Sequence, residues 1–146
     1  MDLGLKNKNA VITGASQGIG EAIARALADE GCNVAICARN KERLDKTVSD
    51  LQAKGVTAIG VIADLSGEKG CQSFIEEAAK KLGSIQILVN NVGGMIPGTL
   101  ATMDESTWNT AINVNLMAAI YTTKHSVEYL KNNEWARILN VTGFSG

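Results

Sequence analysis

The sequence predicts an α/β fold: a doubly wound parallel sheet of at least five strands with helices on both faces. Three observations predict it. Five short apolar runs are separated by longer amphipathic stretches. The runs are nearly continuous in apolar residues, as expected for strands that are buried on both faces. A glycine-rich turn joins the first run to the first amphipathic stretch. Alternation of this kind builds strand–helix–strand units whose ligand crevice lies at the carboxyl ends of the strands.

The five apolar runs place the strands. We expect them at residues 9–13, 33–38, 57–62, 85–90 and 136–141. No repeat, low-complexity tract or linker interrupts the alternation, so residues 1–146 are expected to form one domain.

The stretches between the runs have the apolar spacing of helices. The first, 18–30, ends at Gly31, and the second, 40–54, has Asn40 as its N-cap. A third helix is expected over 67–82. The stretch 104–131 is too long for one ordinary helix, so we expect a short helix from Asp104 and a long one from about Val114 to Lys131.

Composition excludes several classes of function. The net charge is −1, with 14 basic and 15 acidic residues spread evenly, which predicts neither nucleic-acid nor membrane-surface binding. No apolar run approaches the length of a membrane-spanning helix, and the N-terminus lacks the apolar core of a signal peptide. Three cysteines without a CxxC pair, and a single histidine, predict free buried thiols in the cytoplasm and no metal site.

Residues 13–20, TGASQGIG, form a candidate phosphate-binding turn between the first strand and the first helix. Gly14 permits a sharp turn, Gly18 permits close approach of a diphosphate, and Gly20 permits close packing of helix on strand. The helix start offers free N–H groups and a partial positive charge. An ordinary glycine-rich turn is the alternative, but the position between strand and helix favours a dinucleotide site.

The residues after the second strand predict which dinucleotide binds. An acid there accepts hydrogen bonds from the ribose of NAD, whereas a base binds the 2′-phosphate of NADP. This sequence has Ala38 and then Arg39, with no acid, and a guanidinium can bind a phosphate through two hydrogen bonds. We therefore expect NADP(H), with Ser16 and Lys41 placed to assist. A solvated surface charge is the alternative role for Arg39.

Four motifs together resemble the short-chain dehydrogenase/reductase family. They are Thr-Gly-x-x-x-Gly-x-Gly from Thr13, Asp64-Leu65 after the third strand, NNVG at 90–93, and NVN at 113–115. The resemblance extends over essentially all 146 residues and implies a Rossmann fold.

The resemblance also implies a set of cofactor contacts. They are Gly14, Ser16, Gln17, Gly18, Ile19 and Gly20 at the phosphates and ribose, Arg39 at the 2′-phosphate, Asp64 and Leu65 at the adenine, and Asn91, Val92 and Gly93 at the adenosine ribose. Asn90 and Asn91 are equally suited to act as structural clamps between strands.

Catalysis in that family uses a Tyr as acid or base, a Lys four residues later, a Ser that polarises the carbonyl and an Asn that anchors a proton path. Asn115 matches the Asn. At the end of the fifth strand, Gly143 stands where the family has its Ser. Thr142 is the candidate substitute hydroxyl and Ser145 a second one, and both are also ordinary turn residues.

The family's Tyr-x-x-x-Lys lies beyond the fifth strand. Tyr121 and Lys124 precede that strand within a helical stretch, so they are not taken as this pair. We therefore expect the amino-terminal part of an NADP(H)-dependent oxidoreductase, which transfers hydride between nicotinamide and a carbonyl or secondary alcohol, and we expect the 146-residue chain alone to be inactive. The alternative is a catalytically incompetent NADP(H)-binding module or fragment.

The stretch 104–131 is also expected to pair copies of the chain into a homodimer or homotetramer. The apolar residues expected in this interface are Leu116, Ile120, Val127 and Leu130.

Overall fold

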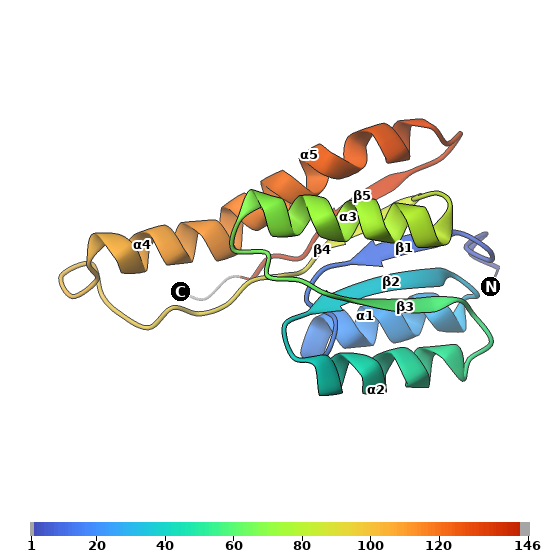
Figure 1. The fold of residues 1–146 in the computed structure, drawn as a ribbon, viewed down its shortest axis with the longest axis horizontal. Helices are drawn as coiled ribbons and strands as arrows, with labels where there is room; N and C mark the ends of the chain where they lie inside the picture. Colours follow the sequence, from blue (N-terminus) through green and yellow to red (C-terminus); the bar gives the residue numbers. More distant parts are fainter. Residues whose placement is uncertain (1, 144–146) are drawn as a thin grey trace.

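The computed structural model describes residues 2–143 and has one five-stranded parallel sheet (Figure 1). The strands are β1 (Asn9–Ile12), β2 (Asn33–Ala38), β3 (Ala58–Ile62), β4 (Ile87–Asn90) and β5 (Arg137–Asn140). Their order in the sheet is β3-β2-β1-β4-β5, and every pair is parallel. The doubly wound fold is therefore confirmed. The strand order reverses between β1 and β4, which is where such folds form a crevice.

Helices cover both faces of the sheet (Figure 1). The described helices are α1 (Gly18–Asp29), α2 (Lys41–Gln52), α3 (Glu68–Leu82), α4 (Glu105–Ile112) and α5 (Ala118–Lys131), with a π-helical turn η1 (Asn113–Met117) between the last two, and α4 projects beyond the sheet. The helices α1 and α2 pack on one face, and α3 and α5 pack on the other. The predicted cap is present, because the Asn40 side chain accepts a hydrogen bond from the N–H of Arg43 at 2.9 Å.

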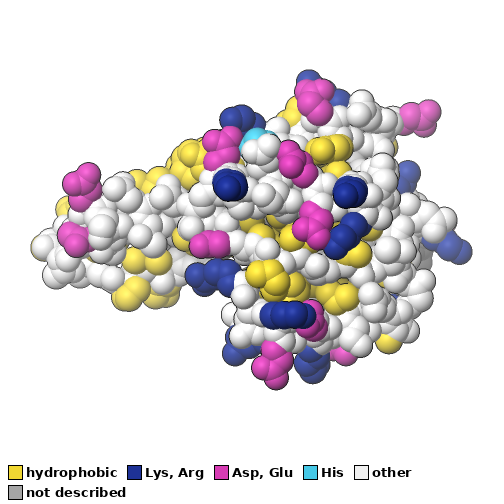
Figure 2. Space-filling model, in the orientation of Figure 1, with side chains coloured by type: hydrophobic (Ala, Val, Ile, Leu, Met, Phe, Trp, Pro, Cys, Tyr) yellow, Lys and Arg dark blue, Asp and Glu magenta, His cyan; other side chains and the backbone are white. Residues whose placement is uncertain are grey.

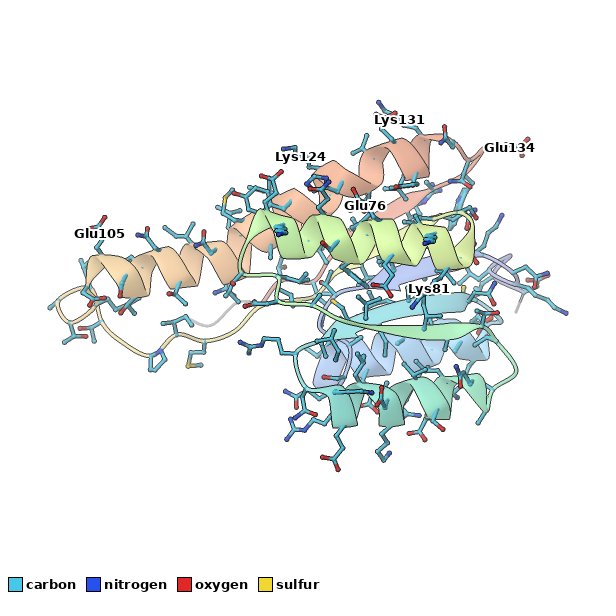
Figure 3. All side chains as sticks on the ribbon, in the orientation of Figure 1. Glu76, Lys81, Glu105, Lys124, Lys131 and Glu134 are labelled. Carbon is cyan, nitrogen blue, oxygen red and sulfur yellow. The ribbon has the colours of Figure 1, made fainter. Side chains whose placement is uncertain are left out.

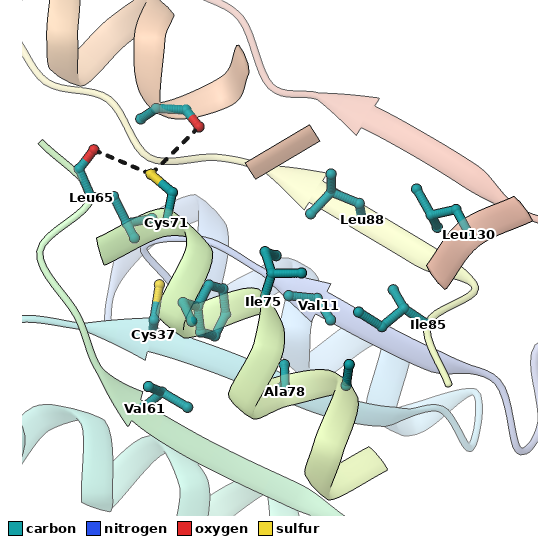
Figure 4. Packing of buried hydrophobic residues seen from close by; sticks show 14 residues of the cluster. Val11, Cys37, Val61, Leu65, Cys71, Ile75, Ala78, Ile85, Leu88 and Leu130 are labelled. Carbon is teal, nitrogen blue, oxygen red and sulfur yellow. Dashed lines mark hydrogen bonds between the residues drawn. The ribbon is translucent and has the colours of Figure 1, made fainter. Parts of the chain in front are cut away.

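Two apolar layers form the core, one on each side of the sheet. Val11 of β1 faces α3 and α5, whereas its neighbours Ala10 and Ile12 face α1 and α2. Figure 4 shows the first layer, in which Leu88 of β4 and Ile75 of α3 lie together. This alternation explains the nearly continuous apolar runs, because successive residues of a strand supply opposite layers.

The three cysteines are free and buried, as predicted. Burial raises the pKa of Cys37 to about 12 and that of Cys71 to about 11, so both are protonated near neutral pH.

The two helices expected within 104–131 are present as α4 and α5, and the π turn η1 joins them into one continuous helical path. Ile112 and Asn113 keep right-handed helical backbone angles, and the N–H of Ala118 donates to the carbonyl of Asn113 across the π turn. No glycine or proline occurs in this stretch to end the helix. The chain instead passes from α4 to α5 through the wider π turn.

The outer part of this path carries an exposed apolar stripe. Trp108, Ile112, Leu116 and Ile120 follow one another at intervals of four residues and are 41%, 45%, 54% and 45% exposed. Figure 2 shows apolar side chains on this projecting part of the molecule. Leu130, which we expected in the same surface, is instead buried in the core beside α3.

The last strand departs from the expectation of burial on both faces. All four residues of β5 are exposed, with Ile138 at 43% and Leu139 at 47%. Within residues 2–143, β5 is one of the two edge strands of the sheet, and little of the described chain covers it. No described helix is both long enough and apolar enough to cross a membrane.

Candidate nucleotide-binding site

A groove of about 770 Å³ lies at the carboxyl ends of the strands. Its walls come from the β1–α1 turn, the end of β2, the loops after β3 and β4, and the helical path around η1. The lining residues are Gly14, Ser16, Gln17, Gly18, Ile19, Cys37, Ala38, Arg39, Ala63, Asp64, Leu65, Ser66, Asn91, Val92, Gly93, Thr110, Asn113 and Val114. All the predicted cofactor contacts except Gly20 therefore lie in one groove.

The β1–α1 turn has the geometry of a phosphate-binding turn. Gly14 and Gly18 adopt φ values of 65° and 60°, which favour glycine. A β-carbon on Gly14 would lie 2.9 Å from Cγ2 of Val92. The described side chains leave the first turn of α1 uncapped, so its N–H groups are available to an anion.

Gly20 does not line the groove. A β-carbon there would lie 2.4 Å from Nδ2 of Asn91 and 2.5 Å from the carbonyl oxygen of Gly14. Its function is therefore the predicted close packing of helix on strand, while the expected direct contact with the cofactor is not supported by its position.

Two asparagines at the end of β4 act as clamps. Nδ2 of Asn91 donates to the carbonyl oxygens of Thr13 and Gly14 at 3.0 Å each, which joins β4 to the phosphate turn. Nδ2 of Asn90 donates to Oδ1 of Asn140 at 2.9 Å, which joins β4 to β5, and its Oδ1 accepts from Thr122 at 2.6 Å. A clamp between strands is therefore confirmed for Asn90, whereas Asn91 clamps the loop after β4 to the phosphate turn and also lines the groove.

The sequence indicated only that Thr13 begins the Thr-Gly-x-x-x-Gly-x-Gly motif, and the structure shows what its side chain does. Its hydroxyl oxygen accepts hydrogen bonds from the N–H groups of Asn91 and Val92, at 2.9 Å each, and donates to the carbonyl of Val89 at 3.4 Å. This side chain is 2% exposed. Thr13 thereby fixes the loop that forms one wall of the groove.

A side pocket of about 480 Å³ adjoins the groove at the end of β2. It is lined by Ser16, Gln17, Arg39, Asn40 and Arg43. Lys41, which we expected to assist here, instead pairs with Asp45 on the exposed side of α2. Arg43 is the second cation of the pocket, and no sequence signal distinguished it from Lys41.

The loop after β3 supplies Asp64 and Leu65. The Ser66 N–H donates to Oδ1 of Asp64 at 3.0 Å, and this hydrogen bond lowers the pKa of the carboxyl group. Leu65 is 4% exposed and packs into the core while lining the groove. Ser66 lines the groove as well, although the sequence alone did not single it out.

Asn115, the candidate catalytic Asn, lies on η1 but not in the groove lining. Its Oδ1 accepts from the N–H of Gly94 at 2.9 Å, and its Nδ2 donates to the carbonyls of Gly94 and Ala111 at 3.0 Å each. Asn115 therefore ties the loop after β4 to the π turn. The groove residues on this wall are Thr110, Asn113 and Val114.

Within residues 2–143, no hydroxyl group from the end of β5 lines the groove. Thr142 is exposed and absent from the lining, and Ser145 lies outside the described residues. Tyr121 packs against the core, while Lys124 projects from α5 (Figure 3) and pairs with Glu68 at 2.7 Å. Rejection of Tyr121 and Lys124 as the catalytic pair agrees with these positions.

Comparison with known proteins gives a consistent result. The model of the short chain dehydrogenase family matches residues 8–146. An uncharacterised oxidoreductase of Bacillus subtilis, YvrD, is 37% identical over all of this chain, which spans 55% of that protein. The 3-oxoacyl-[acyl-carrier-protein] reductase of Staphylococcus epidermidis is 33% identical over 96% of this chain and 58% of its own length.

Solved structures show the same fold. The L-sorbose reductase of Gluconobacter frateurii, complexed with NADPH and L-sorbose, superposes with a TM-score of 0.92 at 32% identity, over 96% of this chain and 54% of that one. A short chain dehydrogenase of Burkholderia cenocepacia in complex with NADP gives a TM-score of 0.89 at 34% identity, over 93% and 55%. The chain thus spans a little over half the length of these relatives. With a family match over residues 8–146 and the groove described above, this chain belongs to the short chain dehydrogenase family.

Proposed function

We propose that the chain binds NADP(H) and supplies the nucleotide-binding part of an oxidoreductase acting on a carbonyl or secondary alcohol. The observation that carries this proposal is the pairing of an uncapped phosphate turn with an arginine-lined side pocket at the end of β2. The NADPH and NADP complexes of the two structural relatives support the same cofactor.

The choice of NADP(H) over NAD(H) rests on charge. The side pocket contains Arg39 and Arg43, and neither aspartate nor glutamate is among its described lining residues. A carboxylate would accept hydrogen bonds from a ribose hydroxyl but repel a phosphate, whereas guanidinium groups bind phosphate strongly.

The proposed chemistry divides between cofactor and chain. Bound nicotinamide supplies or accepts the hydride. The described residues hold the groove in shape: Asn91 clamps the phosphate turn, and Asn115 ties the loop at Gly94 to the π turn. A proton donor beside the substrate oxygen is also needed for carbonyl reduction.

A second candidate function follows from the lining of the groove. Among the described residues that line it, none is a tyrosine or a lysine that could serve as the family's acid and its partner. This favours a unit that binds NADP(H) without transferring hydride on its own.

Titration of the protein with NADPH and NADH, followed by cofactor fluorescence, tests the cofactor. We expect tighter binding of NADPH, and we expect Arg39→Asp to reduce the NADPH/NADH affinity ratio about tenfold or more, because a charged hydrogen-bond donor is replaced by a repelling carboxylate. An unchanged ratio in Arg39→Asp would contradict the assignment.

Addition of a ketone to the same NADPH complex tests whether this chain transfers hydride on its own. We expect binding without oxidation, and ketone-dependent loss of NADPH absorbance would contradict the expectation that the 146-residue chain alone is inactive.

We also propose that the apolar stripe of Trp108, Ile112, Leu116 and Ile120 pairs with the same stripe of a second copy. Its spacing is symmetric about residue 114, so an antiparallel partner helix sets Trp108 opposite Ile120 and Ile112 opposite Leu116. Each of these side chains is at least 41% exposed in the single chain, and pairing would remove this apolar area from water.

Light scattering coupled to gel filtration tests this pairing. The wild-type protein is expected to elute as a dimer or larger, and Leu116→Lys as a monomer, because the lysine would place a charge inside an apolar contact. Leu100→Lys is the matched control, since Leu100 is 85% exposed and lies outside the stripe. A monomeric wild-type protein at micromolar concentration would contradict the proposal.

A further inference from the structure

The side pocket at the end of β2 contains two arginines with different surroundings. Arg39 follows the strand directly, whereas Arg43 reaches the pocket from the first turn of α2. We infer that Arg43, oriented by Gln17, is a specificity-determining residue that binds the phosphate on the adenosine ribose together with Arg39. This inference rests on the proposed cofactor.

Local structure explains why Arg43 and not Lys41 faces the pocket. Oδ1 of Asn40 accepts the N–H of Arg43 at 2.9 Å, which fixes the first turn of α2. Nη1 of Arg43 then donates to Oε1 of Gln17 at 2.5 Å, across 26 positions of the sequence. Lys41 pairs with Asp45 instead, and both side chains are largely exposed.

The positive charge in the pocket suits a ligand that carries two negative charges. A phosphate monoester carries about −1.5 to −2 charges near pH 7, so one guanidinium does not neutralise it. The contact of Arg43 is a neutral amide, and within residues 2–143 no ion pair joins it to a carboxylate.

The geometry of a guanidinium suits this double contact. It has five N–H donors in one plane, so Arg43 can keep the hydrogen bond to Gln17 and still present other donors to a phosphate. Gln17 itself belongs to the phosphate turn. The Gln17–Arg43 hydrogen bond therefore connects the part of the site for the diphosphate to the part for the ribose phosphate.

Two small ligands isolate this phosphate in a calorimetric titration. Adenosine 2′,5′-bisphosphate carries it, and adenosine 5′-monophosphate does not. We expect Arg43→Ala to weaken binding of the bisphosphate by about tenfold to a hundredfold, the usual loss for a charged hydrogen bond, and to change binding of the monophosphate less than about twofold. Arg43 is exposed, so its replacement is not expected to disturb the core.

Lys41→Ala is the matched control, because it removes one positive charge from the same turn of α2 but none of the pocket lining. We expect it to change binding of either ligand less than about twofold, since exposed charges at this distance are screened by salt.

Arg43→Lys keeps the charge but loses the planar fork of the guanidinium, and is expected to recover only part of the affinity for the bisphosphate. When Gln17→Ala is added to Arg43→Ala, it is expected to weaken binding of the two ligands equally, because its effect on the ribose phosphate acts through Arg43.

The outcomes separate this inference from the proposed cofactor. If the wild-type protein and Arg43→Ala prefer the bisphosphate over the monophosphate by the same affinity ratio, Arg43 does not determine specificity. The proposal that the chain binds NADP(H) then still stands. If Arg43→Ala and Lys41→Ala weaken binding of the bisphosphate by the same factor, the loss reflects net charge alone, and the inference is overturned. If the wild-type protein does not distinguish the two ligands, both the inference and the proposed cofactor are wrong.

Discussion

Replacement of Gly70 by alanine is expected to lower the free energy of unfolding by about 3 kcal/mol, although alanine normally favours a helix. Gly70 lies in the first turn of α3, against the loop that follows β3. A β-carbon there would lie 1.8 Å from the carbonyl oxygen of Asp64 and 2.9 Å from its carbonyl carbon. Both are backbone atoms, so the clash cannot be relieved by rotation of a side chain.

The same substitution is expected to weaken NADPH binding, because the new β-carbon pushes on the backbone of Asp64, which lines the groove. Urea denaturation measures the stability, and a fluorescence titration measures the binding. Lys69→Ala is the control, because it changes an exposed neighbour in the same helical turn. A Gly70→Ala protein as stable as Lys69→Ala would show that α3 does not pack this closely on Asp64.

The strands were predictable because burial on both faces leaves a continuous apolar run. Residues 33–38 match β2 at both ends. The run at 85–90 started too early, since Ile85 is fully buried but precedes the hydrogen-bonded strand, which begins at Ile87. An apolar run therefore reports burial, whereas the ends of a strand depend on backbone pairing with a neighbour that the sequence does not specify.

The site was predictable where its residues are consecutive in the sequence. The phosphate turn and Arg39 needed only a strand, a turn and a helix in succession. The choice of Arg43 over Lys41 depends on the direction of side chains in one helical turn and on Gln17, 26 positions away. Contacts of this kind follow from the assembled fold and have no local signal.

The same reason explains Asn115. Its position in a helical stretch matched the family, but its hydrogen bonds to Gly94 span 21 positions. The π turn that presents it has no glycine or proline to mark it. The sequence therefore identified the residue, while only the structure showed which backbone it holds.

Replacement of Thr13 by valine is expected to destabilise the protein by about 3 kcal/mol and to weaken NADPH binding. Valine has nearly the shape of threonine, but its methyl group cannot accept a hydrogen bond. The N–H groups of Asn91 and Val92, which now donate to the Thr13 hydroxyl at 2.9 Å, would lose their acceptor. Each such loss of a buried partner costs about 1–3 kcal/mol. Both residues line the groove, so the cofactor loses a fixed wall.

Thr13→Ser provides the decisive comparison, measured by urea denaturation and NADPH titration. Serine keeps the hydroxyl and loses one methyl group, which costs about 1 kcal/mol of apolar burial. At this site, which is 2% exposed, burial alone would rank valine above serine because valine has more apolar surface. If the hydrogen bonds decide, the serine variant is instead the more stable and binds NADPH more tightly than the valine variant. A valine variant that equals or exceeds serine in stability and affinity would mean that packing, and not the threonine hydroxyl, holds the loop after β4 in place.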